Sequence, residues 1–330
     1  MNNIDNVYYI NLDKDTDKKR DMLEEFNRVG IKNPVRIPGV YGKTMTKSDI
    51  RKVTTPFCGA ICTPTIIGCG TSHLNTWKEI IKNNDRYAMV CEDDIKFADA
   101  NFIQIYNSLI NEVPPDFDLI YLGCFGCEKN MFYNPSFLSI NNPKTIKEIN
   151  SYEIREPSMA FAFHCYIISN TAAKKLVDYY QKNGINTHID VSVQQLARKN
   201  LIKRYTITPN LVLQTSWLNI NSSENAVNFP IILNKIMKNF ELFPGMPLDY
   251  TMSCSFGHFY DYEINPWTVI FILLAIVLYK FNYNPLTIAI GFLLLTIPDL
   301  IIPKPHYTQY IVSLFILLTP TLIKHYKLIK

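Results

Sequence analysis

The chain has 330 residues, which is room for one large or two medium domains, and its formal net charge is only +4. Its lysines are scattered and do not form a basic stripe with interleaved aromatic residues, so the composition argues against a nucleic-acid partner. Apolar residues are concentrated in the last quarter, whereas the part up to about Tyr262 has the mixed composition of a soluble domain with a sizeable core.

The first predicted unit is a strand followed by a helix. Val7–Leu12 is β-branched and aromatic, which predicts a strand. The small polar residues after it suit a loop and a helix N-cap, and a helix is expected over Asp17–Val29, ended by Gly30. Val35–Ile37 then predicts a second short strand before a Pro-Gly turn.

The middle of the chain predicts an α/β sheet. Thr44–Pro64 is expected to be a surface loop, and a helix is expected to begin at His73, after Gly68–Ser72, and to reach about Lys82. Tyr87–Cys91 is too short for a helix and predicts a buried central strand. Further helices are expected over Asn101–Ile110, from Thr171 and over Val191–Ala197, and strands over Phe117–Leu122, Ala160–Ser169 and Arg204–Ile207. This alternation favours a sheet flanked by helices.

Three apolar stretches make up the tail, at 266–279, 285–302 and 307–323. Each is somewhat short for the roughly 20 residues that span a bilayer, but together they carry too few charges for the core of a domain this size. We therefore expect C-terminal transmembrane helices over 264–330 with a basic end, a connecting lobe over 219–263 and a catalytic domain over 1–218. This organisation predicts a protein anchored in a membrane by its C-terminus, with a cytosolic catalytic domain.

The eight cysteines are expected to be reduced. No secretory signal precedes the first strand, and the cysteines are spread through apolar or strand-like contexts, as buried thiols are. A zinc site formed by Cys58, Cys62, Cys124 and Cys127 is the alternative, but the two pairs have different spacing and no histidine pattern supports them.

The acidic run Glu92-Asp93-Asp94 is the main candidate for chemistry. Three consecutive carboxylates at the end of a buried strand resist joint ionisation unless a positive charge compensates them. The carboxyl edge of an α/β sheet is also where ligands bind in such folds. Hard oxygen ligands suit Mg²⁺ or Mn²⁺, which can bridge a carboxylate to a diphosphate. The alternative is a solvated turn, because a short motif alone is weak.

The residues around this run form an ordered set that carries a family resemblance. The set comprises Val7 to Asp13 with Arg20, then Gly68, Cys69, Ser72, His73 and Trp77, then Val90 to Asp94, and Ile120 to Gly123. In order and spacing it resembles glycosyltransferase family 25, which contains bacterial lipopolysaccharide glycosyltransferases and procollagen galactosyltransferases, over roughly residues 5–215. The resemblance implies a GT-A-like, Rossmann-related mixed sheet, a UDP-sugar donor and a metal at the acidic run. It does not cover the tail.

The resemblance also implies a donor pocket. Asn11, Leu12 and Asp13 would line the nucleotide pocket, and Arg20 would meet a phosphate or pair with the acidic loop. Asp93 would contact the ribose or the sugar.

Ser72 and His73 are further candidates for the donor side. At the expected helix start they would face the diphosphate, where exposed N–H groups favour anions. The alternative is a capping serine beside a packed histidine.

Metal and base roles follow in the same way. Glu92 and Asp94 would hold the metal, and His188 is a possible third ligand, although a lone histidine is usually structural. Asp190 is the candidate base that deprotonates the acceptor hydroxyl, because it matches an acidic position that the family carries after a Ser-x-x-Ala-x-x-Leu-like helix.

Three residues depart from the family's pattern, namely Ile66, Gly70 and His164, and they leave an altered acceptor or a disabled site open. The hypothesis is metal-assisted transfer of a hexose from a UDP-sugar to a hydroxyl of a glycan, glycolipid or hydroxylated protein, by direct displacement with inversion. A catalytically degenerate, membrane-anchored binding or scaffold protein and a nucleotidyltransferase are the alternatives.

Overall fold

The computed structural model describes residues 1, 3–127, 144–157, 159–215, 229–243, 246–301 and 306–329. The chain divides into two compact units, one of Met1–Leu218 with Phe243–Gly245 and one of Asn219–Leu242 with Met246–Lys330. Each unit has its own core and is described by itself.

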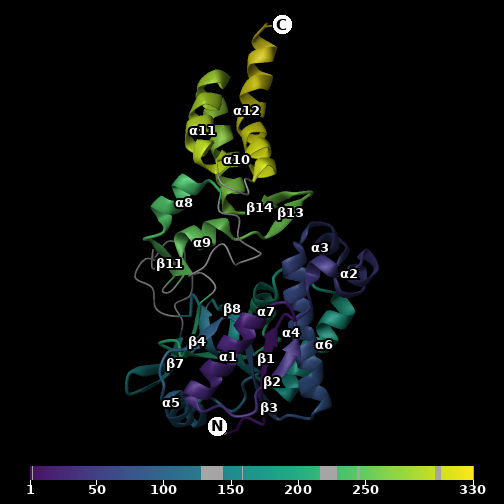
Figure 1. Ribbon diagram of the computed structural model, residues 1–330, viewed down its shortest axis with the longest axis vertical. Helices are drawn as coiled ribbons and strands as arrows, with labels where there is room; N and C mark the ends of the chain where they lie inside the picture. Colours follow the sequence, from purple (N-terminus) through teal and green to yellow (C-terminus); the bar gives the residue numbers. More distant parts are fainter. Residues whose placement is uncertain are drawn as a thin grey trace. The chain divides into compact units, whose positions relative to one another are not determined.

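An eight-stranded mixed sheet organises the first unit (Figure 1), in the order β2-β1-β3-β8-β5-β9-β7-β6. The strands are β1 (Asn6–Asn11), β2 (Val35–Pro38), β3 (Tyr87–Glu92), β5 (Leu119–Phe125), β6 (Lys144–Ile149), β7 (Tyr152–Glu156), β8 (Phe161–Ser169) and β9 (Arg204–Thr208). β1 pairs in parallel with both β2 and β3, whereas β8 runs antiparallel to its neighbours β3 and β5. The prediction of a mixed α/β sheet is confirmed.

Helices pack on both faces of this sheet because its side chains alternate between two apolar cores. In β1, Tyr8 lies in the core shared with α4 (Pro64–Lys82), α6 (Asn170–Asn183) and α7 (Ile189–Arg198). The next residue, Tyr9, lies in the core shared with α1 (Thr16–Val29) and α5 (Phe102–Leu109). A short antiparallel pair, β4 (Ile95–Phe97) with β10 (Val212–Gln214), adjoins the end of β3.

The segment expected to be a surface loop contains helices. The short 3-10 helix η1 (Gly42–Thr44) comes first, followed by α2 (Lys47–Val53), α3 (Pro56–Ile61) and the first turns of α4. Thr46, Thr55 and Thr63 accept a backbone N–H as N-caps, and a proline stands in the first turn of α3 and of α4. Proline is tolerated there because the first N–H groups of a helix lack a partner in any case. The loop prediction is wrong because these prolines start helices.

The second unit is mainly helical. It contains α8 (Ile231–Met237), α9 (Leu248–Ser253), α10 (Pro266–Lys280), α11 (Pro285–Leu300) and α12 (Tyr307–Ile329), with the short strands β11 (Glu241–Phe243), β12 (Met246–Pro247), β13 (Gly257–Phe259) and β14 (Tyr262–Ile264). Its core includes Trp267, Phe271, Phe292 and Leu317. A capping box at Asn265, reciprocated by Thr268, begins α10.

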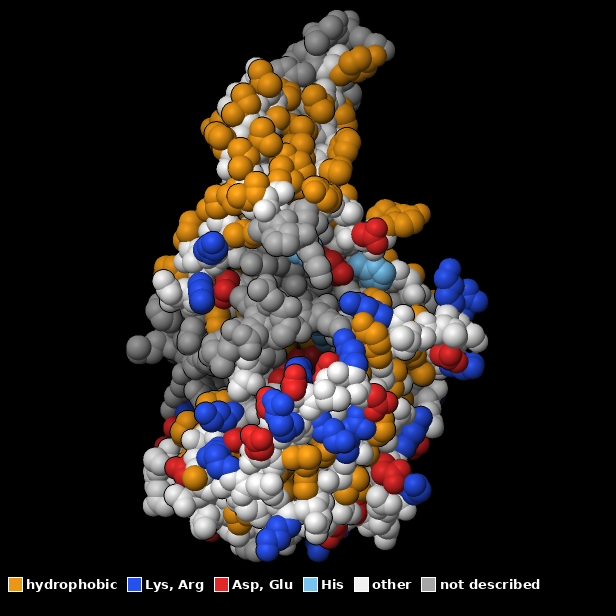
Figure 2. All heavy atoms as spheres, viewed as in Figure 1, with side chains coloured by type: hydrophobic (Ala, Val, Ile, Leu, Met, Phe, Trp, Pro, Cys, Tyr) orange, Lys and Arg blue, Asp and Glu red, His pale blue; other side chains and the backbone are white. Residues whose placement is uncertain are grey.

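The predicted C-terminal transmembrane helices, and the membrane-anchored localisation based on them, are wrong. In the part of the chain that the structure describes, no helix combines the length and the apolarity that crossing a membrane needs. α10 and α11 have 15 and 16 residues, against the roughly 20 that a bilayer core requires. α12 is longer, but polar residues such as Gln309 and Ser313 interrupt it. The apolar composition of the tail is instead divided between the core of this unit and exposed side chains on the same helices (Figure 2), among them Leu273 and Leu294.

Two disulfides correct the prediction for the cysteines. Cys58 is bonded to Cys62 and Cys124 to Cys127, with Cα atoms 4.7 and 5.9 Å apart. The spacing of three or four residues brings each pair within the usual disulfide range. Among the described residues, Cys69, Cys91, Cys165 and Cys254 are not part of a disulfide.

Candidate active site

The ends of two parallel strands bring the predicted donor residues together. Asn11 ends β1 and Glu92 ends β3, and the register pairs Ile10 with Glu92. The Nδ2 of Asn11 donates to Oδ2 of Asp93 at 2.7 Å, and Nζ of Lys18 lies 3.3 Å from Oδ1 of Asp93. The first turns of α1 and both strand ends therefore meet at Asp93, on the edge where α/β sheets bind ligands.

Burial and charge act against each other at this carboxylate. Burial raises the pKa of Asp93 above its usual range, although the charge of Lys18 and the hydrogen bond from Asn11 oppose the rise. Burial alone would lower the pKa of Lys18, but the charges of Asp93 and Asp94 outweigh it and the net direction is upward. Lys18 was missed in the sequence because nothing local shows which strand end the helix approaches.

Arg36 is a second cation that the sequence did not indicate. It lies on β2 opposite Tyr9 of β1, and its guanidinium donates to Oδ1 of Asn11 at 3.0 Å and to Oδ1 of Asp13 at 2.6 Å. Leu12, between these two residues, is half-buried and lies against Gly39. The structure thus brings the predicted residues 11–13 together with Arg36 and Asp93.

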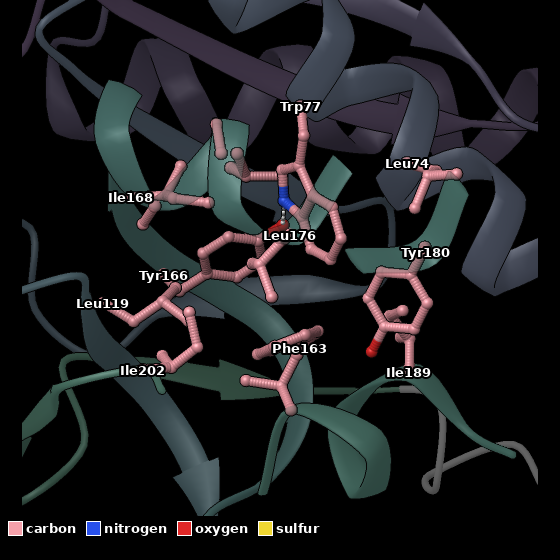
Figure 3. Packing of buried hydrophobic residues seen from close by; sticks show 14 of the residues in the cluster. Leu74, Trp77, Leu119, Phe163, Tyr166, Ile168, Leu176, Tyr180, Ile189 and Ile202 are labelled. Carbon is pink, nitrogen blue, oxygen red and sulfur yellow. Dashed lines mark hydrogen bonds between the residues drawn. The ribbon is translucent and has the colours of Figure 1, made fainter. Parts of the chain in front are cut away.

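Glu92 is held by a buried chain of hydrogen bonds. Trp77 Nε1 donates to the hydroxyl of Tyr166 at 2.9 Å (Figure 3), and that hydroxyl lies 2.9 Å from Nδ1 of His73. A carboxylate only accepts, so the tautomer of His73 with one ring proton carries it on Nε2, and Nδ1 then accepts from the Tyr166 hydroxyl. Nε2–H of His73 donates to Oε1 of Glu92 at 3.2 Å. His73 is 1% exposed, and its hydrogen bond from α4 positions the carboxylate of Glu92.

The helix start predicted at His73 is wrong. α4 begins at Pro64, so Ser72 and His73 lie beyond its second turn, where backbone N–H groups are engaged within the helix. The hydroxyl of Ser72 accepts from the N–H of Val40 at 2.8 Å and donates to the carbonyl of Gly68 at 2.7 Å. The argument from exposed N–H groups therefore falls, and contact of either side chain with a donor stays a prediction.

Asp94 is fixed by the strand pair beside β3. Gln214 of β10 donates from Nε2 to Oδ2 of Asp94 at 3.1 Å, and the hydroxyl of Thr215 donates to the backbone carbonyl of Asp94 at 2.8 Å. The acidic run consequently turns away from β3 in a defined conformation, tied to a segment more than a hundred residues later in the chain.

Asp190 lies in the first turn of α7, and two backbone N–H groups orient its carboxylate. Oδ2 accepts from the N–H of Ala162 at 2.7 Å and Oδ1 from the N–H of Val191 at 2.7 Å. Ala162 has a φ of 66°, a conformation that is uncommon for a residue with a Cβ and that is retained where surrounding structure fixes it. His188 is the N-cap residue of the same helix.

Metal-ligand atoms gather at one place in the described part of the chain. The ligand atoms of Cys69, His73 and Glu92 all lie within 4.8 Å of one another, whereas Asp94 and His188 form no such group. Burial, reinforced by the charges of Glu92, Asp190 and Asp94, raises the pKa of the Cys69 thiol well above its usual range. The metal roles of Asp94 and His188 stay predictions.

Arg20 lies on the exposed surface of α1. Its guanidinium forms ion pairs of 2.9 Å with Asp17 and with Asp21, and its side chain is 61% exposed. Exposed pairs of this kind contribute little to stability. The ion pairs of Arg20 are thus formed within α1, and its contact with a phosphate stays a prediction.

The three residues that depart from the family pattern take part in packing. Ile66 is buried in α4, and a Cβ at Gly70 would lie 3.0 Å from Cδ1 of Ile185. His164 occupies the space left by the missing side chain of Gly123 and makes a 3.2 Å hydrogen bond from Nε2 to the carbonyl of Val212. Burial lowers the pKa of His164 to about 4, partly opposed by the charge of Asp94.

Sequence comparison agrees with this site. Residues 4–193, more than half of the chain, match Glycosyltransferase family 25 (LPS biosynthesis protein). The chain belongs to glycosyltransferase family 25. The matched segment includes the ends of β1 and β3, the middle of α4 and Asp190 at the start of α7, whereas β10, which contacts Asp94, lies beyond it.

Relatives of this family 25 chain include Procollagen galactosyltransferase 1-A of Xenopus laevis, 31% identical over 130 residues, which are 36% of the chain and 21% of the relative. Procollagen galactosyltransferase 1 of Danio rerio is 29% identical over 185 residues, 52% of the chain and 28% of the relative. Inactive glycosyltransferase 25 family member 3 of Homo sapiens is 29% identical over 130 residues, 36% of the chain and 22% of the relative. The matched part thus spans between a fifth and just over a quarter of these relatives.

Proposed function

We propose that this family 25 chain transfers a hexose from a UDP-sugar to a hydroxyl of a glycan, glycolipid or hydroxylated protein, by direct displacement with inversion. The observation that carries the proposal is the meeting of two parallel strand ends with a separately anchored carboxylate. Asn11 and Asp93 join the ends of β1 and β3, and the antiparallel strand β8 begins near the end of β3, where the N–H of Ala162 donates to Asp190. A donor and a base would therefore lie at the same edge of the sheet.

The donor side would be formed by β1, β2 and the acidic run. Asn11 and Asp93 offer an amide and a carboxylate for ribose or sugar hydroxyls, and their mutual hydrogen bond orients both before a ligand arrives. Lys18 and Arg36 supply positive charge beside them, which suits the negative charge of a nucleotide diphosphate.

The contacts of the three carboxylates in the acidic run leave room for a role of Glu92 and Asp94 in binding a divalent cation. Asp93 is paired with the ammonium of Lys18, whereas Glu92 accepts from the imidazole of His73 and Asp94 from the amide of Gln214. Glu92 and Asp94 are oxygen ligands of the kind that Mn²⁺ and Mg²⁺ prefer, and they would hold the ion. When bound, the cation would supply neutralisation of the charge left on the departing diphosphate.

Asp190 is the group that we propose as base. Its carboxylate is oriented by the N–H groups of Ala162 and Val191, so little ordering remains to be done when an acceptor binds. The acceptor oxygen would attack the anomeric carbon as the bond from that carbon to the phosphate oxygen breaks, while the hydroxyl proton passes to Asp190. One displacement of this kind inverts the anomeric configuration.

A binding protein without turnover is the second candidate, because one of the relatives is named an inactive family member. The galactose and procollagen in the names of other relatives provide the first donor and acceptor class to test. The two candidates share donor binding and differ in product formation. A test must therefore measure both.

Purified chain should be incubated with a panel of UDP-sugars and acceptors, with released UDP and transferred product followed by mass spectrometry. Asp190→Asn is expected to lower kcat about 10²- to 10⁴-fold while UDP still binds. Asp178→Asn, at an exposed carboxylate of α6, is the matched control and should retain activity. UDP binding without any product from the wild-type chain would favour the binding protein, and full activity of Asp190→Asn would refute the assignment of the base.

A further inference from the structure

A thiol, an imidazole and a carboxylate lie close together between α4 and the end of β3 in the first unit. Cys69 and His73 are one helical turn apart on α4, so both side chains project from one face of the helix. Glu92, at the end of β3, lies opposite them. The distances from Oε1 of Glu92 are 3.2 Å to Nε2 of His73 and 3.9 Å to Sγ of Cys69.

These separations approach those of a tetrahedral zinc site. Zinc bonds of about 2.3 Å to sulfur and about 2.0–2.1 Å to nitrogen or oxygen, at tetrahedral angles, place the ligand atoms about 3.3–3.6 Å apart. The observed distances of 3.2 and 3.9 Å differ from this range by a few tenths of an ångström. All three ligand atoms lie within 4.8 Å of one another, so zinc binding requires rotations of the side chains that draw the ligand atoms together.

The surroundings would also support a bound ion. His73 is buried, and its other ring nitrogen, Nδ1, already faces the hydroxyl of Tyr166 at 2.9 Å. With a metal on Nε2 the ring proton would lie on Nδ1 and would donate to Tyr166, as the second partner of a metal-bound histidine commonly does. The charges of Asp94 and Asp190 reach the same point and favour a cation there.

The identity of the ion follows from the ligand set. Thiolate and imidazole are soft or borderline ligands and select Zn²⁺ over Mn²⁺ or Mg²⁺, which prefer oxygen. We propose that Cys69, His73 and Glu92 bind one Zn²⁺ ion, with a fourth position left for water or a ligand. Binding releases the proton of the Cys69 thiol to solvent, while the ring proton of His73 moves from Nε2 to Nδ1 and the Tyr166 hydroxyl turns to accept it.

Zinc at this site would take Glu92 away from the donor side. If Glu92 ligates zinc together with Cys69 and His73, it is a poorer ligand for the cation proposed to bind between Glu92 and Asp94. Zinc would therefore inhibit the reaction. This consequence, unlike zinc binding itself, rests on the proposed function. The site therefore offers a way for a soft metal ion to regulate an enzyme that uses a hard one.

The test uses Co²⁺ and Zn²⁺ alone as probes on the purified full chain. Co²⁺ is expected to give a sulfur-to-metal charge-transfer band and the intense visible bands of tetrahedral cobalt, which Zn²⁺ displaces. Cys69→Ser should abolish the charge-transfer band and weaken Zn²⁺ binding at least tenfold, whereas Cys254→Ser, at another cysteine outside the disulfides, should change neither. His73→Gln tests a second ligand, so that misfolding of one variant does not decide the outcome.

Binding and inhibition are measured separately. Absence of the charge-transfer band from the wild-type chain, or its persistence in Cys69→Ser, overturns the proposed site. Zinc inhibition of UDP-sugar turnover should be relieved in Cys69→Ser. If the chain binds zinc through Cys69 but forms no product with any donor, the zinc site stands and the proposed function fails.

Discussion

The buried chain from Trp77 to Glu92 gives a prediction whose size can be worked out. Tyr166→Phe removes one hydroxyl that accepts from Trp77 Nε1 and donates to Nδ1 of His73, and all three side chains are at most 1% exposed. The variant leaves a buried donor and a buried acceptor without partners, each at a cost of about 1–3 kcal/mol. The two groups together cost about 2–6 kcal/mol. We therefore expect the free energy of unfolding around α4 and β8 to fall by about 3 kcal/mol.

Hydrogen exchange followed by mass spectrometry measures this loss in the first unit alone. Protection of peptides from α4 and β8 should fall about a hundredfold, since each 1.4 kcal/mol is about tenfold. Tyr9→Phe is the control, because Tyr9 is 2% exposed and its hydroxyl has no hydrogen bond within the described residues. It should change protection by less than about tenfold. Equal effects of the two variants would refute the hydrogen-bond chain as a source of stability.

Two further predictions concern charge. Lys18→Met removes the cation beside Asp93, so the pKa of Asp93, already raised by burial, should rise further. A ¹³C NMR titration of the Asp93 carboxyl would measure this rise. An unchanged pKa would mean that the 3.3 Å pair has no influence on it. His164 has a folded pKa of about 4, below the usual value of 6.5, so the unfolded chain takes up the proton first and stability falls as the pH drops from about 6.5 to about 4. The loss should total about 3 kcal/mol, and His164→Gln should remove this part of the pH dependence of hydrogen exchange; an unaltered pH profile in the variant would contradict the pKa.

Local sequence patterns predicted the strands that form the donor edge. β1 and β3 are short β-branched, aromatic or apolar runs, and the acidic run after Tyr87–Cys91 lies where the sheet ends, as expected. Local patterns gave a wrong prediction at prolines, because proline occurs both in loops and in the first turn of a helix. Pro56 and Pro64 indicated a loop, but each stands in the first turn of a helix whose threonine N-cap had been missed.

Contacts between distant segments could not be predicted from one sequence. Arg36 reaches Asn11 only because β2 pairs with β1, and Ala162 reaches Asp190 only through the path of β8 beside α7. The tail shows a related limit. Hydropathy indicated many apolar residues correctly, but helix length and polar interruptions, which decide whether a segment can cross a membrane, depend on where each helix ends.

The three carboxylates of the acidic run are chemically similar but have different hydrogen-bond and ion-pair partners. Glu92 accepts from the imidazole of His73, Asp93 pairs with Lys18 and Asn11 beside β1, and Asp94 accepts from Gln214 of β10. Their side chains meet different neighbours because Glu92 ends β3 while Asp93 and Asp94 form the turn that follows it. The three carboxylates are therefore not one equivalent ligand set: loss of Glu92 should disturb the cysteine-histidine cluster, loss of Asp93 the start of α1, and loss of Asp94 the β4–β10 pair. Each substitution thus has its own structural signature, by which its effect on donor binding can be separated from its effect on the fold.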